Sequence, residues 1–162
     1  MIWNALQTDG TLLYGPGGEV LQRFSVYDGY AIECLRWQGV DVAILTGRTS
    51  PAVAQRARTL SIGRVVQGAR DKGVAVGALA RDAAVDLSHV CFVGDDVFDL
   101  PAMRLVGWSA APANARPEVK AEATYVCELE GGRGAVREVA ELILRARDAW
   151  PPAGAMPSAL NA

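Results

Sequence analysis

The sequence predicts an α/β fold, with a doubly wound parallel sheet and helices on both of its faces. Short runs rich in apolar and β-branched residues alternate with stretches of helical spacing along most of the chain. Crossover connections between parallel strands are right-handed and place helices on both faces of such a sheet. Several of the apolar runs end in Asp, Thr or Gly. Polar residues in these positions are typical of ligand sites at the carboxyl ends of strands.

The length and composition indicate one folded domain. A chain of 162 residues that is 51% hydrophobic can bury a full core, and it is short for two domains of ordinary size. We expect this domain to cover residues 1–150. Residues 151–162 are rich in Pro and Ala and uncharged, and we expect them to form a flexible tail.

Charge and hydropathy argue against nucleic-acid and membrane partners. The formal net charge is −2, with Lys and Arg scattered along the chain, so no basic surface is indicated. No apolar run approaches the roughly 18–20 residues of a membrane helix, and the N-terminus lacks a signal pattern. We therefore expect a cytoplasmic protein. The three cysteines lie far apart within apolar patterns, which is typical of small buried side chains.

The first half of the chain predicts a strand, a hairpin, a helix, a strand and a second helix. A glycine-rich turn between two apolar runs indicates the hairpin, which would project from the main sheet. Tyr30, Cys34 and Trp37 recur at helical spacing, and Ser50-Pro51 is typical of a helix start. The expected ranges are 2–6, 12–24, 27–38, 40–45 and 51–60.

The second half continues the alternation of strands and helices. Asp99 followed by Pro101 predicts a helix cap and a first-turn proline. The last helix is amphipathic, with Val136, Val139 and Leu144 on one face. The expected strands are 64–67, 90–93, 106–110 and 125–127. The expected helices are 71–81, a short one that ends at 104, a turn or helix at 117–121, and 135–149.

The stretch from His89 to Met103 carries the most informative pattern. Gly94 ends a buried run sharply, and two adjacent carboxylates, Asp95 and Asp96, follow it. Carboxylates at the carboxyl end of a parallel strand suit a hard cation with oxygen ligands. Taken alone, Gly-Asp-Asp is equally compatible with a solvated turn.

Three further polar groups occur at strand ends or helix starts. They are Asp9, the pair Thr46-Gly47, and Lys72. Each is weak evidence alone, because Thr-Gly is usually a turn and a Lys at a helix start is usually a solvated charge. In a doubly wound sheet they would converge with Asp95 on one crevice suited to phosphate and magnesium.

In this order these motifs resemble those of haloacid dehalogenase-type phosphatases. More narrowly, Asp28-Gly29-Tyr30, Thr46-Gly47-Arg48 and the stretch 131–138 resemble the cap-less 3-deoxy-D-manno-octulosonate 8-phosphate (KDO 8-P) phosphatases. The likeness extends from about residue 6 to residue 147. It implies a Rossmann-like fold without a cap domain, dependence on magnesium, and a homotetramer in which a neighbouring subunit covers the site. One hairpin and one helix fill the chain between Asp9 and Thr46, so a cap has no room.

The resemblance implies a role in phosphate chemistry for several positions. Asp9 matches the family's general acid/base, which protonates the leaving oxygen and then activates water. The Thr46 hydroxyl, with Gly47 beside it, would bind the phosphoryl group, and Lys72 would neutralise it.

Magnesium and substrate positions follow from the same resemblance. Asp95 would hold magnesium, with Asp96 adjacent and the main-chain carbonyl of Asp9 as a further ligand. The residues expected in loops near the substrate or a subunit interface are Arg48, Gly132 and Arg133.

Two features depart from the family's pattern. The family's nucleophile is an Asp two residues before Asp9, and this chain has Gln7 there. A neutral amide cannot form an aspartyl-phosphate intermediate, and it would be a weak metal ligand. The hairpin is also several residues shorter than in the family, where it builds the oligomer.

Three functional hypotheses follow. The first is a pseudoenzyme that binds magnesium and a phosphorylated sugar acid or similar anion with little or no turnover. The second is an active magnesium-dependent phosphomonoesterase that uses an unconventional route, such as water activated by Asp9. The third is a structural subunit with a vestigial site.

Overall fold

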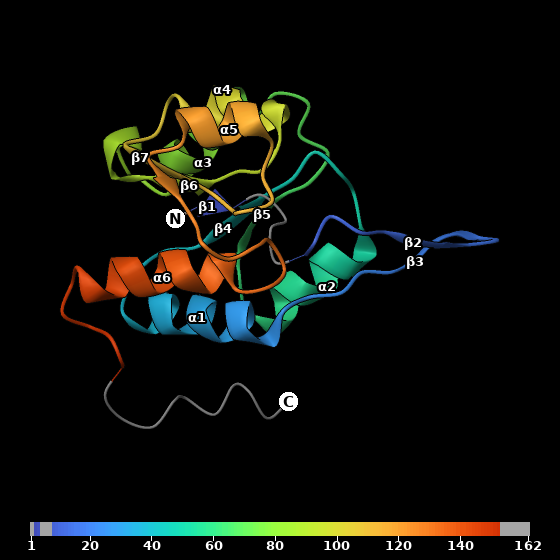
Figure 1. The fold of residues 1–162 in the computed structure, drawn as a ribbon, viewed down its shortest axis with the longest axis horizontal. Coiled ribbons are helices and arrows are strands. Elements are labelled where there is room, and N and C mark those ends of the chain that lie inside the picture. The colour runs from blue at the N-terminus through green and yellow to red at the C-terminus, as the bar shows by residue number, and fades with distance from the viewer. Residues whose placement is uncertain (1, 4–7, 153–162) are drawn as a thin grey trace.

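The computed structural model of the protein describes residues 2–3 and 8–152 (Figure 1). A six-stranded sheet lies at its centre, in the order β5-β4-β1-β6-β7-β8. Every pair of neighbouring strands in this sheet is parallel. The strands are β1 (Ile2–Trp3), β4 (Ala43–Leu45), β5 (Arg64–Val66), β6 (Cys91–Val93), β7 (Trp108–Ala111) and β8 (Tyr125–Val126).

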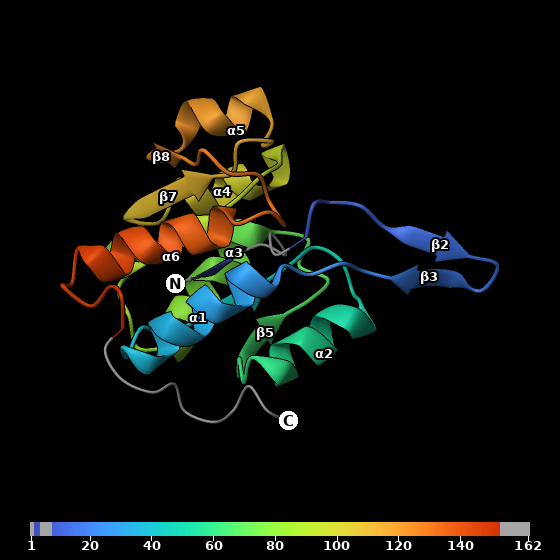
Figure 2. The ribbon, with the colours of Figure 1, turned by 60° about the horizontal axis from the view of Figure 1, so that its bottom comes forward.

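Helices cover both faces of the sheet, as Figures 1 and 2 show. One face packs against α1 (Val26–Trp37), α2 (Pro51–Thr59) and α6 (Ala135–Arg145). The other packs against α3 (Lys72–Asp82), α4 (Leu100–Met103) and α5 (Pro117–Glu122). The prediction of a doubly wound parallel α/β fold is therefore confirmed.

Alternation within the central strands divides the core into two layers. In β6, Cys91 and Val93 pack into the cluster with α1 and α6, whereas Phe92 packs into the cluster with α3 and α4. In β4, Ile44 and Leu45 divide in the same way. Because successive side chains of a strand point to opposite faces, a short apolar run can supply both layers at once.

Two predicted boundaries shift because helices close with extra turns. The strand expected from residue 40 begins at Ala43. The backbone of Gly39 has a φ of +73°, and the Val40 amide donates to the Leu35 carbonyl, so residues 39–40 complete the end of α1. Likewise α6 ends at Arg145 instead of 149, and the Ala149 amide donates back to the Leu144 carbonyl.

The strand expected at 106–110 is β7, which begins at Trp108. Gly107 belongs to the preceding loop, where its amide donates to the Leu87 carbonyl. A Cβ at Gly107 would lie 1.9 Å from the Ser88 carbonyl oxygen. The loop therefore crosses the backbone of η1 (Leu87–His89) too closely for any side chain.

A second, two-stranded sheet lies apart from the layered body. The strands β2 (Leu13–Gly15) and β3 (Gly18–Leu21) pair antiparallel, and they extend away from the helices in Figure 1. Leu13 and Leu21 are exposed, whereas Leu12 is half-buried. In the described stretch from 8 to 46, the helices and strands are this pair, α1 and β4.

The cysteines are buried and free, as expected. Burial raises the pKa of the Cys91 and Cys127 thiols to about 12. In the described part of the chain, no helix has the length and apolar character needed to cross a membrane.

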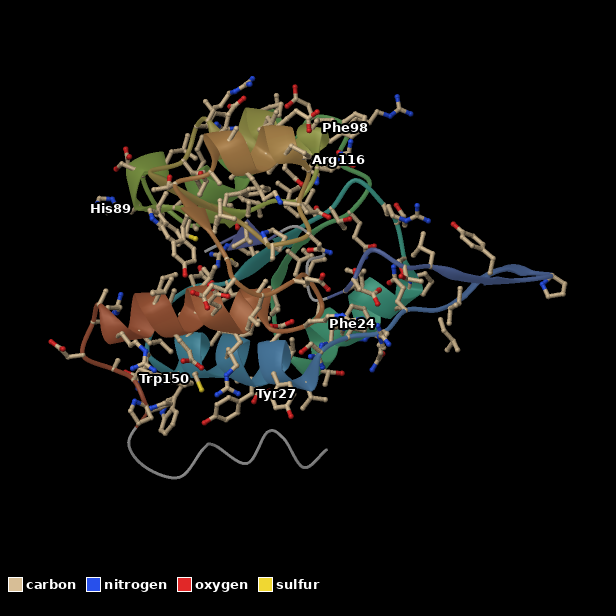
Figure 3. The ribbon with its side chains drawn as sticks, in the orientation of Figure 1. Phe24, Tyr27, His89, Phe98, Arg116 and Trp150 are labelled. Atoms are coloured by element: carbon tan, nitrogen blue, oxygen red, sulfur yellow. The ribbon has the colours of Figure 1, made fainter. Side chains whose placement is uncertain are left out.

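The end of the described chain packs beside α1 and α6. The guanidinium of Arg137 lies 5.9 Å from the ring centre of Tyr27 and 5.6 Å from that of Trp150. Figure 3 shows both rings on the outer side of α1. Most of the expected tail, from residue 153 onward, lies outside the described residues.

Candidate functional site

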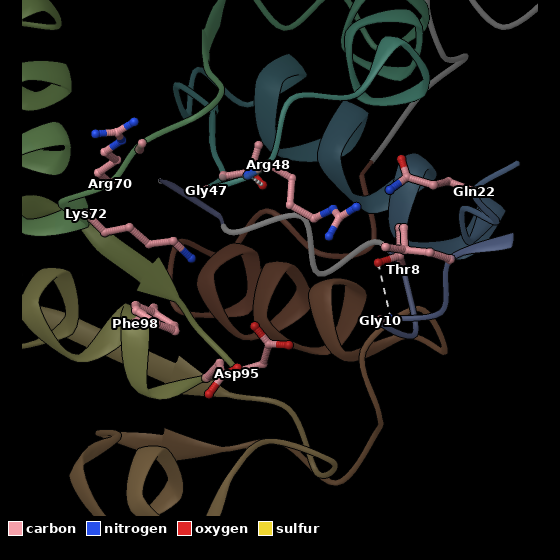
Figure 4. Close-up of a pocket in the computed structure, with 13 residues that line it drawn as sticks. Thr8, Gly10, Gln22, Gly47, Arg48, Arg70, Lys72, Asp95 and Phe98 are labelled. Carbon is pink, nitrogen blue, oxygen red and sulfur yellow. Dashed lines mark hydrogen bonds between the residues drawn. The ribbon is translucent and has the colours of Figure 1, made fainter. Parts of the chain in front are cut away.

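A cavity of about 580 Å³ lies where several strands of the main sheet end (Figure 4). The loops after β4 and β6 contribute Thr46 with Gly47 and Asp95 with Asp96, and the start of α3, which follows β5, contributes Lys72. The segment before β2 adds Thr8, Gly10 and Leu12, and Gln22 follows β3. The carboxyl edge of the sheet thus brings together Thr46, Lys72 and Asp95, three of the phosphate and metal candidates that the sequence had indicated.

The loop after β4 is held in place by its own hydrogen bonds. The Thr46 amide donates to the Val66 carbonyl at 2.9 Å, and the Thr46 hydroxyl accepts from the Arg48 amide at 3.2 Å. A Cβ at Gly47 would lie 3.4 Å from the Ala69 carbonyl oxygen, so the two loops run close together. The side chain of Arg48, which also lines the cavity, donates to the Tyr14 hydroxyl at 2.9 Å. The hairpin is therefore tied to this loop.

Lys72 lies at the first position of α3, which the Asp71 side chain caps by accepting from the Val74 amide. Its side chain is only 7% exposed, and its ammonium forms an ion pair with the carboxylate of Asp99, which is fully buried. The second oxygen of Asp99 accepts from the amides of Asp95 at 3.0 Å and Asp96 at 3.2 Å. Asp99 thereby links the candidate phosphate-binding cation to the candidate metal-binding loop.

Asp99 is the N-cap residue of α4, and Pro101 lies in the first turn of this helix, as predicted. The Asp99 side chain makes no capping hydrogen bond to α4. Asp99 is also the third residue of η2 (Val97–Asp99), where it forms a reciprocal capping box with Asp96. A Cβ at Gly94 would lie 2.6 Å from the Cβ of Asp99, so the glycine makes room for it.

Sequence reasoning therefore missed Asp99 as a site residue. One signal was available, because a buried lysine must have a partner of opposite charge. The four-residue spacing between Asp95 and Asp99 was a second signal, since a single helical turn brings such positions together.

The two adjacent carboxylates have different surroundings. Asp95 is half-buried, and Asp96 is exposed and caps η2 by accepting from the Val97 amide at 2.7 Å. Among the described residues, no three His, Cys, Asp or Glu side chains cluster as a metal site. Magnesium commonly uses one or two carboxylates, retains waters and shares the phosphate oxygens of a substrate. The donor set around Asp95 therefore fits magnesium held jointly with a phosphate.

Asp9 lies beside the cavity, between the lining residues Thr8 and Gly10. One oxygen accepts from the Thr11 amide at 3.0 Å, and the other pairs with Arg23. The Thr11 amide and, to a lesser extent, the Arg23 guanidinium hold the pKa of the Asp9 carboxyl below its usual value. Asp9 is therefore ionised at neutral pH.

The loop after β8 packs directly onto the Asp9 segment. Gly132 has a φ of +70°, and a Cβ there would lie 2.5 Å from the Thr8 carbonyl carbon and the Asp9 nitrogen. A side chain at 132 would displace Asp9, so Gly132 has a positioning role. Arg133, by contrast, is exposed and pairs with Glu130 at 3.3 Å, outside the described lining of the cavity.

A buried carboxylate anchors the helix that follows this loop. Asp28 is fully buried in α1 and accepts from the Arg137 amide near the start of α6 at 3.0 Å. Burial raises the pKa of the Asp28 carboxyl despite this hydrogen bond. The Asp28-Gly29-Tyr30 pattern thus contributes to packing between α1 and α6.

Gln7 lies outside the described residues, and its assignment to the nucleophile position stays a prediction. The register of β1 bears on the assignment, because Trp3 pairs with Ile44 on one side and Val93 on the other. Thr46 and Asp95 each follow their strand partner by two residues, whereas Gln7 follows Trp3 by four. Residue 5 is the position that follows Trp3 by two.

Comparisons with known proteins agree with this geometry. The family model of haloacid dehalogenase-like hydrolases matches residues 61–138. The KDO 8-P phosphatase KdsC of Yersinia pestis is 44% identical over 145 residues, which are 90% of this chain and 78% of the relative.

Solved structures resemble the fold closely. The structure of the Y. pestis phosphatase has a TM-score of 0.88 at 44% identity and covers 91% of this chain and 80% of its own. The cobalt-bound phosphatase of Haemophilus influenzae has a TM-score of 0.90 at 36% identity, with coverages of 91% and 88%.

A third structure, from Moraxella catarrhalis, contains magnesium, phosphate and KDO. It has a TM-score of 0.88 at 36% identity and covers 92% of this chain and 87% of its own. Similarity at this level of identity extends over most of the length of each relative. This chain therefore belongs to the KDO 8-P phosphatase family of the haloacid dehalogenase-like hydrolases.

Proposed function

We propose that this protein is a magnesium-dependent phosphomonoesterase that acts on a phosphorylated sugar acid, KDO 8-P. The observation that carries the proposal is the convergence of Thr46, Lys72 and Asp95 on one cavity at the carboxyl edge of the sheet. The M. catarrhalis relative, with magnesium, phosphate and KDO, supports the choice of ligands.

The charge of each residue around the cavity indicates its proposed role. The Thr46 hydroxyl and the Lys72 ammonium bind the phosphoryl oxygens, and Asp99 orients Lys72 through their ion pair. Asp95, with Asp96 beside it, holds magnesium, and bound magnesium supplies Lewis-acid polarisation of the phosphoryl group. A preorganised set of this kind stabilises negative charge as it develops in the transition state.

Asp9 is the proposed acid–base group. Its lowered pKa keeps the carboxylate ionised at neutral pH, which suits a base that takes a proton from water. The same carboxylic acid, once formed, can return the proton to the leaving oxygen. Gly132 keeps the backbone of Thr8 and Asp9 in place.

A second candidate function is binding of magnesium and the phosphorylated ligand without turnover. One observation favours it, because Gln7 stands two residues before Asp9, where the Asp nucleophile of the family is expected. Loss of the nucleophile in a covalent enzyme costs on the order of 10⁶ in turnover.

Phosphate release from KDO 8-P, measured with and without magnesium, separates the two candidates. Turnover of about 1–10³ per second that is lost in Asp9→Asn and Asp95→Asn supports the phosphatase. Thermal stabilisation by magnesium with phosphate, but no turnover, supports the binding protein. A matched control is Asp86→Asn, because Asp86 caps η1 before β6 and lies outside the described lining of the cavity.

If turnover is absent, single Asp substitutions at positions 4, 5 and 7 test whether a missing nucleophile is the reason. The resemblance predicts that Gln7→Asp creates or sharply raises activity, because it adds a nucleophile and a metal ligand. The register of β1 makes Asn4→Asp and Ala5→Asp the necessary comparisons. Activity gained at 4 or 5 and not at 7 would reject the Gln7 assignment.

We also propose that the protein is a homo-oligomer, with a tetramer as the family resemblance suggests. Leu13, Tyr14 and Leu21 of the hairpin are 54%, 64% and 63% exposed. An apolar surface of this kind is typical of a contact between protein chains.

A further inference from the structure

An aromatic ring lies exposed at the rim of the cavity. Phe98 is 73% exposed and is one of the residues that line the cavity. It belongs to η2, between the cavity residue Asp96 and the buried Asp99. Because a 3₁₀ turn has about three residues per turn, the side chains of Phe98 and Asp99 leave the turn in different directions.

This arrangement fixes Phe98 relative to the charged groups. Asp99 is held by Lys72 and by the amides of Asp95 and Asp96. The covalent neighbour of Asp99 therefore has little freedom of backbone position. Figure 4 shows Phe98 on the same side of the cavity as Lys72 and Asp95, across from Gln22 and Thr8.

The stability of the fold does not explain the exposed ring of Phe98. An exposed phenyl group gains little from the hydrophobic effect, which rewards removal of apolar surface from water. Ligand sites, in contrast, commonly pair a few polar groups with apolar or aromatic walls. Here the polar groups are those of Thr46, Lys72 and Asp95, while Phe98 and the half-buried Leu12 supply apolar surface.

The position of the phosphate decides what Phe98 can touch. A phosphoryl group bound by Thr46 and Lys72 lies at the strand ends, so the rest of the substrate extends toward the rim. One face of a sugar ring carries hydrogens bound to carbon, and this face can pack against an aromatic ring. A small phosphomonoester without a ring would not reach far enough to use Phe98.

We propose that Phe98 is a specificity-determining residue that packs against the sugar ring of the substrate. It thereby favours ring-containing phosphomonoesters over short ones. This inference rests on the proposed function, because it assumes that Thr46 and Lys72 bind the phosphate. It adds the sugar ring as the part of the substrate that the site recognises besides the phosphate.

The test compares KDO 8-P with glycerol 3-phosphate, which has a terminal phosphomonoester and no ring. Phe98→Ala should raise KM for KDO 8-P by about tenfold, as expected for lost apolar contact in a pocket, with kcat little changed. KM for glycerol 3-phosphate should change less than twofold. Phe98→Tyr should retain the native preference, because it keeps the ring.

Val74→Ala is the matched control. Val74 is 68% exposed in the first turn of α3, outside the described lining of the cavity. It should leave both KM values unchanged. If the native protein has no turnover, calorimetric affinities for the two ligands in the presence of magnesium replace KM.

The outcomes separate this inference from the proposed function. Equal losses for both ligands in Phe98→Ala, or no loss for either, would overturn the role of Phe98 and leave the phosphate site intact. A native protein that binds neither ligand would overturn both.

Discussion

The buried ion pair between Lys72 and Asp99 offers the sharpest test of how the site is built. Their side chains are 7% and 0% exposed, so Asp99 left alone would be cut off from water, and Lys72 would reach water only through the cavity that it lines. Removal of one partner of a buried pair typically costs about 3–5 kcal/mol. Asp99→Asn retains an oxygen for the amides of Asp95 and Asp96, so we expect a loss near the lower limit, about 3 kcal/mol.

Lys72→Met should cost a similar amount, because it removes the cation that pairs with the fully buried Asp99 carboxylate. The double variant buries no unpaired charge. Its loss should therefore be smaller than the sum of the two single losses by about 2 kcal/mol or more, within the usual range for residues in contact. At about 2–4 °C per kcal/mol for a domain of this size, each single variant should melt roughly 6–12 °C lower.

Urea unfolding at pH 7 measures the free energy of unfolding of the native protein, the two single variants and the double variant. An unchanged m-value checks that each protein exposes the same amount of surface on unfolding. The exposed pair Arg104–Glu122, with side chains 60% and 37% exposed, is the control cycle. Its coupling should be about 0–1 kcal/mol. The reasoning would be refuted if either single variant lost less than about 1 kcal/mol of unfolding free energy at the buried pair. It would also be refuted if the loss in the double variant equalled the sum of the two single losses.

Three further predictions concern stability, assembly and metal binding. Because burial raises the pKa of the Asp28 carboxyl, the folded state holds this proton to a higher pH than the unfolded state does, and native stability falls as pH rises from the unfolded pKa to the folded one. The measured quantity is the urea midpoint of Asp28→Asn minus that of the native protein. This difference should be higher at pH 7 than at pH 4, and an equal difference at both pH values would contradict the prediction. By light scattering at micromolar concentration the protein should be an oligomer, and Leu13→Ser with Leu21→Ser should shift it toward monomer; a native monomer would reject the hairpin interface. Calorimetry should show weak magnesium binding that tightens when phosphate is present and is lost in Asp95→Asn, whereas micromolar affinity without phosphate would oppose this.

The sequence alone predicted the layered α/β fold and three of the residues that line the cavity, Thr46, Lys72 and Asp95. Short apolar runs such as 90–93 can be buried on both faces only in a sheet covered on both sides, so the alternation of elements was sufficient. The carboxyl ends of parallel strands meet at one edge, and this rule predicts that Thr46, Lys72 and Asp95 lie close together.

Tertiary structure decided what depends on packing between distant segments. The partner of Lys72 is 27 positions away along the chain, and the spacing between Asp95 and Asp99 does not show that Asp99 reaches Lys72. The close approach of Gly132 to Thr8 and Asp9 joins opposite ends of the chain, which sequence spacing cannot reveal. Exposure of Phe98 is likewise a property of the folded surface, because hydrophobicity alone would have placed that ring in the core.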